Sequence, residues 1–120
     1  MEVEVLALSE AIKEWDEVER EIFESLFNYW DYVDIRRLPE FIKLTSWHWK
    51  NKERNWIELK IPKEQLLQLK IGEEVVFKPY KTYGEKIIRL SQKFFAVIGI
   101  LVCSDGTVEE EVKVIYEVRD

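Results

Sequence analysis

The spacing of hydrophobic residues along the chain changes once, near residue 40. Before that point the apolar positions are three or four residues apart, a spacing that places them on one face of an α-helix. These positions are Leu8, Ile12, Trp15, Val18, Ile22, Leu26, Tyr29, Trp30 and Val33. Ser9 suits an N-cap, and Pro39 disfavours helical structure at Leu38. The pattern therefore predicts one long amphipathic helix that ends before Arg36.

After residue 40 the apolar residues alternate with polar ones, which predicts strands. The predicted strands cover residues 41–49, 55–61, 73–80, 85–90, 93–103 and 107–118. Residues 50–54 form a polar loop between the first two strands. Asp105-Gly106 predicts a two-residue hairpin turn of the primed type between the last two.

These elements predict an α+β fold in a single domain of 120 residues. The long N-terminal helix would pack on a curved, mainly antiparallel sheet of six to seven strands, either open or closed as a small barrel. A short helix over residues 62–69, with Pro62 at its first position, would connect two of the strands.

Composition indicates a folded, soluble protein. Hydrophobic residues make up 47% of the chain, more than a disordered acidic chain contains. No apolar run approaches the roughly 20 residues of a membrane helix, and the N-terminus lacks the basic region of a secretory signal. The single cysteine, Cys103, has no internal disulfide partner. We therefore expect a cytoplasmic protein with no membrane partner, and the abundance of Glu and Lys over Asn and Gln is typical of thermophiles.

The charges are sorted along the chain. The formal charge is −8 over residues 1–41, +6 over residues 42–104 and −4 over residues 105–120, which gives the net −6. A net-acidic protein thus contains a basic middle region. The same region carries most of the aromatic residues that fall outside the predicted long helix.

Interleaved aromatic and cationic side chains are typical of surfaces that bind single-stranded nucleic acid. Alternation puts Trp47 and Trp49 on one face of their strand, and pairing across the hairpin would bring one of them near Trp56. The candidate binding residues are Trp47, Trp49, Lys50, Lys52, Arg54, Trp56, Lys81 and Tyr83. The first hypothesis is a non-enzymatic module that binds single-stranded DNA or RNA. The alternative interpretation places the tryptophans in the core beneath the long helix and leaves the lysines as an ordinary solvated face.

A second functional hypothesis rests on the predicted helix. Phe23 and Phe27 lie beside its main apolar stripe and widen the apolar surface to about half the circumference, beyond the roughly 100° of an ordinary surface helix. The sheet or an N-terminal strand could cover this surface. Otherwise Phe23 and Phe27 form an interface with a protein partner or with a second copy in a homo-oligomer.

Catalytic chemistry has little support in the sequence. His48 is the single histidine, and the four glycines form no phosphate-binding loop. Glu109, Glu110 and Glu111 are typical of charges that keep a strand edge from aggregating. We therefore predict no catalytic residue, no metal ligand and no cofactor, with an enzyme built on a pair of carboxylates as a third alternative.

One segment resembles parts of known nucleic-acid-binding folds. Ile61-Pro62-Lys63-Glu64, then Leu69, then the run from Ile71 to Phe77 resembles the strand, short helix and strand of AbrB-type DNA-binding antitoxins. The Gly-Glu-Glu-Val-Val-Phe step within it is also similar to strands of PUA-like and OB-type barrels. The segment covers 17 of the 120 residues. All three folds bind nucleic acid, so the resemblance implies the same kind of ligand.

Overall fold

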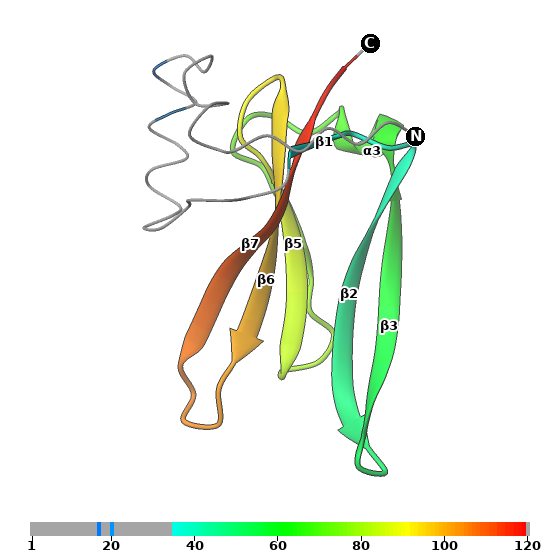
Figure 1. Ribbon diagram of the computed structural model, residues 1–120, viewed down its shortest axis with the longest axis vertical. Helices are drawn as coiled ribbons and strands as arrows, with labels where there is room; N and C mark the ends of the chain where they lie inside the picture. The colour runs from blue at the N-terminus through cyan, green and yellow to red at the C-terminus, as the bar shows by residue number, and fades with distance from the viewer. Residues whose placement is uncertain (1–16, 18–19, 21–34, 120) are drawn as a thin grey trace.

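The computed structural model describes Glu17, Arg20 and residues 35–119, most of which lie in strands (Figure 1). Strands hold 61% of these residues and helices 7%. The predicted α+β class is therefore wrong, because the described chain is mostly β with one short helix, α3 (Lys63–Leu66). The long helix predicted to end before Arg36 falls almost entirely outside the described residues. At its expected end, Ile35 begins a strand instead.

Seven strands form one curled sheet. They are β1 (Ile35–Arg37), β2 (Phe41–Lys50), β3 (Glu53–Pro62), β4 (Glu74–Phe77), β5 (Tyr83–Arg89), β6 (Phe94–Val102) and β7 (Val108–Glu117). Their order is β1-β7-β6-β5-β2-β3, with β4 paired to β5. The β1–β7 pair is parallel and the other described pairs are antiparallel. The sheet curls into a half-barrel and does not close.

Each strand predicted after residue 40 is present, although the turns differ from the prediction. The β2–β3 hairpin turns at Asn51 and Lys52, whose φ angles of 54° and 64° are both positive, as a primed turn requires. The primed turn predicted at Asp105-Gly106 is wrong. There Gly106 alone has a positive φ, and the Cys103 N–H donates to the Thr107 carbonyl across a longer loop.

The core is formed by side chains from one side of β2 together with side chains of β3, α3, β5, β6 and β7. Its members are Leu38, Ile42, Leu44, Ile61, Leu66, Ile87, Phe95, Val97 and Val114. Along β2, Ile42 and Leu44 are buried while Phe41 and Lys43 are exposed, because successive side chains of a strand point to opposite faces. The odd-numbered side of β2 therefore faces away from this core. No helix in the described part of the chain is long and apolar enough to span a membrane.

The Arg89 guanidinium joins the end of β5 to the chain around α3. It donates hydrogen bonds to the carbonyls of Leu67 and Leu69, both at 2.9 Å, beyond the helix. It also donates to the carbonyls of Ser91 and Gln92 in the loop that follows β5. A planar group with five N–H donors can serve four carbonyls at once, whereas an ammonium cannot match this geometry.

We predict that Arg89→Lys lowers the free energy of unfolding by about 2 kcal/mol, because carbonyls served by the guanidinium lose their donors. Chemical denaturation measures the change. Arg36→Lys is the matched control, since Arg36 is exposed and lysine keeps its charge, so the replacement should change stability by less than about 0.5 kcal/mol. Equal stability of the two variants would show that Arg89 does not secure this end of the sheet.

Candidate functional site

The candidate site forms where β2 separates from β5. These strands pair only at Trp47 and Tyr83, and beyond this point β4 occupies the edge of β5 from Glu85 to Ile88. The peptide groups of β2 near the separation therefore need other partners, because an unpaired buried polar group is costly.

Side chains supply those partners. The Glu85 carboxylate accepts hydrogen bonds from the Thr45 backbone N–H at 2.6 Å and from the Thr45 hydroxyl at 2.7 Å. Its second oxygen accepts the Tyr83 hydroxyl at 2.8 Å. The fully buried Ser46 hydroxyl donates to the Tyr83 carbonyl. Glu85 thus attaches β2 to β5 and also orients the Tyr83 ring.

Tyr83 belongs to an aromatic cluster on the odd-numbered side of β2, which we define as Trp47, Trp49, Arg54, Trp56 and Tyr83. The Trp47 ring is at the centre, 5.6 Å from Trp49, 6.1 Å from Trp56 and 6.3 Å from Tyr83, measured between ring centroids. The Arg54 guanidinium carbon lies 4.8 Å from the Trp47 ring centroid, within the range of a cation–π contact. The strand register explains the grouping, since Trp47 is opposite both Trp56 and Tyr83.

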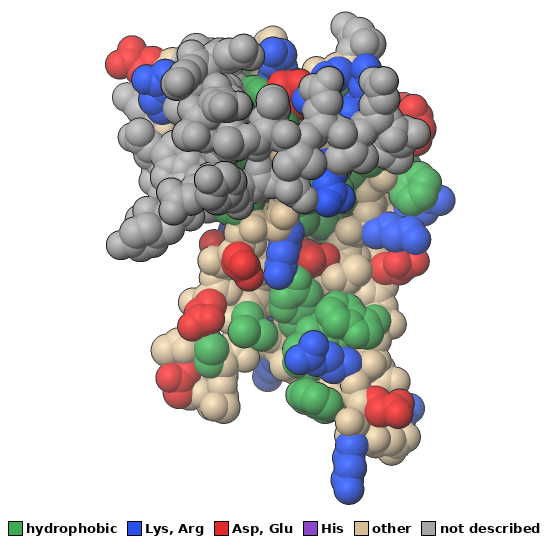
Figure 2. All heavy atoms as spheres, in the orientation of Figure 1, with side chains coloured by type: hydrophobic (Ala, Val, Ile, Leu, Met, Phe, Trp, Pro, Cys, Tyr) green, Lys and Arg blue, Asp and Glu red, His purple; other side chains and the backbone are tan. Residues whose placement is uncertain are grey.

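The cluster has a covered centre and an open margin. Trp47 is 7% exposed, whereas Trp49 is 58% exposed and Trp56 is 53% exposed. Figure 2 shows hydrophobic side chains gathered over the lower part of the sheet, with a cationic side chain lying across them. The sequence predicts the tryptophans either on an open binding surface or in the core. Trp47 is buried, whereas Trp49 and Trp56 present ring surface to solvent.

The remaining predicted residues lie around the cluster or outside the described chain. Lys50 and Lys52 are exposed at the tip of the β2–β3 hairpin, and Lys81 is exposed in the loop before β5. The predicted interface residues Phe23 and Phe27 fall outside the described residues, so the helix interface stays a prediction.

Sequence reasoning missed a second cation–aromatic contact on the same side of the hairpin. The Lys60 Nζ lies 3.7 Å from the centroid of the Phe41 ring, and the Lys43 Nζ lies 6.0 Å from it. The register pairs Lys43 with Lys60 and Phe41 with Pro62. Alternation along β2 and β3 contained the necessary signal, because it places all three side chains on the side that carries Trp47.

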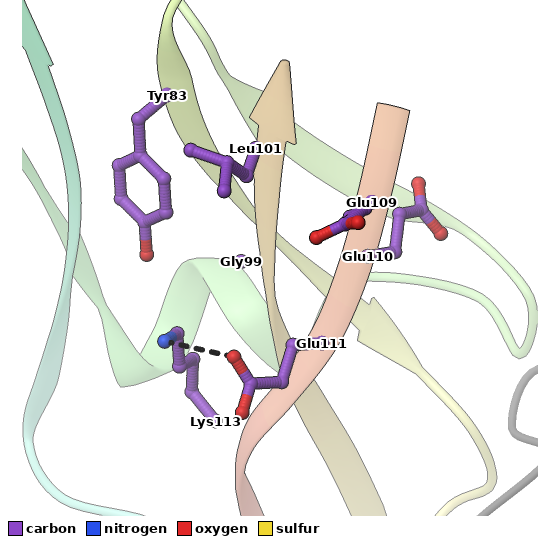
Figure 3. Close-up of a pocket in the computed structure, with 7 residues that line it drawn as sticks. All are labelled: Tyr83, Gly99, Leu101, Glu109, Glu110, Glu111 and Lys113. Carbon is purple, nitrogen blue, oxygen red and sulfur yellow. Dashed lines mark hydrogen bonds and ion pairs between the residues drawn. The ribbon is translucent and has the colours of Figure 1, made fainter. Parts of the chain in front are cut away.

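Beside the cluster the sheet is hollowed over β6 and β7. The hollow has a volume of about 450 Å³ and is lined by Tyr83, Gly99, Leu101, Glu109, Glu110, Glu111 and Lys113. Figure 3 shows the Tyr83 ring and the Lys113 side chain pointing toward one another over Gly99. A Cβ at residue 99 would lie only 2.9 Å from the Tyr83 hydroxyl and 2.7 Å from Lys113 Cε. Glycine therefore leaves room for these side chains to cross β6, and a larger residue would make their ends shift.

Charge differs sharply between the two sides of the cluster. The β2–β3 hairpin, residues 41–62, has a formal charge of +3, and β7 has a formal charge of −3. On β7, Glu111 lies 3.4 Å from Lys113, and Glu110 lies 3.1 Å from Lys86. An anionic ligand at the cluster is therefore attracted to the hairpin side and repelled from the β7 side.

The environment of Tyr83 favours its neutral form. Partial burial raises the pKa of Tyr83 well above its ordinary value, and the hydrogen bond to Glu85 and the charges of Glu85 and Glu111 raise it further. Burial also raises the pKa of Tyr116. The neutral hydroxyl is the donor that Glu85 requires, so the arrangement suits a structural and binding role for Tyr83.

The cluster presents groups that can contact a ligand. Its side chains offer flat aromatic faces and a guanidinium. Within residues 35–119 no group of three or more His, Cys, Asp and Glu side chains is placed to hold a metal ion. Comparison of the chain with protein-family models, with curated proteins and with solved structures gives no match. The resemblance to AbrB-type, PUA-like and OB-type proteins therefore has no support beyond the short segment that suggested it.

We predict that Glu85→Ala lowers the free energy of unfolding by about 2–3 kcal/mol, because partly buried donors on Thr45 and Tyr83 lose their acceptor. Hydrogen exchange at the Thr45 amide should accelerate, and quenching of Trp47 fluorescence by an aqueous quencher should increase. Glu109→Ala removes an exposed glutamate on β7 and should have little effect in either experiment. Unchanged exchange at Thr45 would contradict the role assigned to Glu85.

A pH dependence follows from Tyr83. The hydroxyl ionises at about pH 10 in the unfolded chain and at higher pH in the fold. Its contribution to stability is therefore complete below about pH 10 and is lost as the pH rises toward the folded-state pKa. We predict that stability falls in this alkaline range and that Tyr83→Phe weakens the dependence, leaving the part due to Tyr116. Denaturation at a series of pH values tests this, and an identical pH profile for the variant would contradict it.

Proposed function

We propose that the protein binds single-stranded nucleic acid on the outer side of the β2–β3 hairpin. The observation that carries this proposal is the pair of exposed indole rings, Trp49 and Trp56, beside Arg54 and around the covered ring of Trp47. Bases of a single strand have free faces that stack on such rings, a contact worth roughly 1–3 kcal/mol per base.

The cations of the hairpin supply the contacts to phosphate. Arg54, Lys50 and Lys52 are exposed next to the indoles, and the hairpin carries a formal charge of +3. Phosphate contacts of this kind release counterions and make binding weaker as salt rises. Among the described strands, β5 and β6 separate the hairpin from the acidic strand β7 in the sheet order.

The second cation–aromatic contact extends the surface along the hairpin. Phe41 lies six positions before Trp47 on β2, a distance of roughly 20 Å along an extended strand. Lys43 and Lys60 accompany Phe41 in the same way that Arg54 accompanies Trp47. Two aromatic contacts with cations between them form a path for a strand of several nucleotides.

We predict that Trp49→Ala and Trp56→Ala each weaken binding of a single-stranded oligonucleotide of about ten nucleotides by roughly five-fold to a hundred-fold. The physical reason is the loss of one stacking surface. Fluorescence anisotropy of a labelled oligonucleotide at low salt measures the affinity. Val108→Ala is the matched control, because it truncates an exposed apolar side chain on β7 and should leave the affinity unchanged.

The salt dependence provides an independent check of the same site. Replacing Lys50 and Lys52 by Gln should reduce the slope of log affinity against log salt by about one to two. No binding at low salt, or binding that is insensitive to salt, would remove the proposal. Equal affinity of the tryptophan variants and the wild type would place any binding elsewhere.

A further inference from the structure

The free edge of β3 is the longest unpaired strand edge in the described sheet. β3 spans ten residues, ends the strand order and pairs with β2 alone among the described strands. On one face Ile57 and Leu59 are each 37% exposed. Exposed strand edges usually carry features that prevent pairing with another chain, such as a short strand, a bulge, a proline or charged side chains.

Within the described part of the chain, no backbone group pairs with the outer edge of β3. In an antiparallel ladder every second residue directs both its N–H and its C=O away from the neighbouring strand. The side chains of β3 alternate between Arg54, Trp56, Glu58 and Lys60 on one face and Ile57, Leu59 and Ile61 on the other. Pro62, which has no N–H, stands at the end of the strand and leaves the rest of the edge intact.

The charges on β3 are complementary to those of a second β3. In an antiparallel pair centred on Leu59, Glu58 is opposite Lys60 of the partner copy, and Lys60 is opposite the partner's Glu58. On the other face Ile57 is opposite Ile61, and Leu59 is opposite its own copy. Opposite charges and apolar residues that face each other across strands both stabilise a sheet.

Other antiparallel registers bring fewer complementary side chains opposite each other. A pair centred on Glu58 places Glu58 opposite its own copy. A pair centred on Ile57 places Arg54 opposite Lys60, so both registers juxtapose like charges. A pair centred on Trp56 matches Arg54 with Glu58 but places Ile57 opposite Asn55. Register is selected by the side chains that it brings together, so the pair centred on Leu59 is favoured.

Glu58 is free to change partner at small cost. Its carboxylate lies 3.7 Å from the Lys43 ammonium within the same hairpin, and both side chains are about half exposed. An exposed ion pair at this distance contributes little to stability.

We propose that this protein forms a two-fold symmetric dimer through antiparallel pairing of β3 with β3 of a second copy, centred on Leu59. The two-fold axis is perpendicular to the sheet, so the pairing joins two half-barrels into one continuous sheet. It also places both aromatic clusters on the same face of that sheet. The dimer does not depend on nucleic acid, and its test needs none.

Charge inversion on the intact chain tests the proposed pairing. Glu58→Lys places two ammonium groups opposite each other across the interface, and Lys60→Glu places two carboxylates there, so each variant should weaken the dimer by roughly tenfold or more. Sedimentation equilibrium from micromolar to near-millimolar protein measures the dissociation constant. Mixing the two variants should restore association, because the mixed pair again matches opposite charges. The double variant carrying both changes should dimerise by itself for the same reason.

Glu109→Lys is the matched control, since it makes the same charge change on an exposed glutamate of β7 and should leave the dimer unaffected. Circular dichroism of each variant verifies that the sheet is retained. A wild-type protein that stays monomeric throughout the concentration range would overturn the proposal. It would also be overturned by a dimer that tolerates both single inversions, or by single variants that do not associate when mixed.

Discussion

The attachment of β2 to β5 depends on the Glu85 carboxylate. The strands share a single residue pair, Trp47 with Tyr83, because β4 pairs with β5 beyond it. Glu85 accepts the N–H and hydroxyl of Thr45 and the hydroxyl of Tyr83, so one side chain replaces the missing ladder hydrogen bonds. It also determines where the Tyr83 ring lies, and hence where the Trp47 ring finds a stacked neighbour. The separation of β2 from β5 and the aromatic cluster are therefore linked, because the Glu85 contact that joins the two strands also orders the cluster.

The cluster combines a rigid centre with accessible margins. Trp47 is held by rings on three sides and by Arg54, so ligand binding does not have to order it. Trp49 and Trp56 keep more than half of their surface exposed. A surface prepared in this way loses less side-chain entropy when a ligand stacks on it than one assembled from mobile side chains would. In the proposed complex, the opposite charges of the hairpin and β7 would orient a polyanion along the hairpin, which is also the direction in which Phe41, Lys43 and Lys60 lie.

Sequence patterns predicted the features of the fold that arise locally. Alternation located the six strands after residue 40. The polar loop at residues 50–54 correctly predicted that Trp47 or Trp49 lies near Trp56, and the register shows that it is Trp47. Alternation defines two faces of a strand but does not say which face is covered, so the exposure of Trp49 and Trp56 stayed undecided. Three residues carry too little periodicity to reveal β1. The primed turn forms at Asn51-Lys52, which lacks the glycine that marks such turns, whereas Asp105-Gly106 carries that mark but forms a longer loop. Glu85 gave no signal, because its acceptor role depends on Thr45, forty residues away.

The curled sheet leaves unpaired strand edges on two sides, and they differ in a way that bears on assembly. On one side β1 pairs with only the last three residues of β7, so residues 108–114 of β7 have no partner on that edge among the described strands, and they carry Glu109, Glu110 and Glu111. The edge at β3 is ten residues long and has no bulge in its register with β2. The charges on β3 do not protect it from a copy of itself, because acidic and basic residues two positions apart become complementary when the strand is reversed. Charges of one sign would repel a second copy in every register. The side of β3 that carries Trp56 also carries Glu58 and Lys60, the two charges that would match in the dimer. The proposed ligand binding and the proposed self-association would therefore use adjacent parts of the same hairpin.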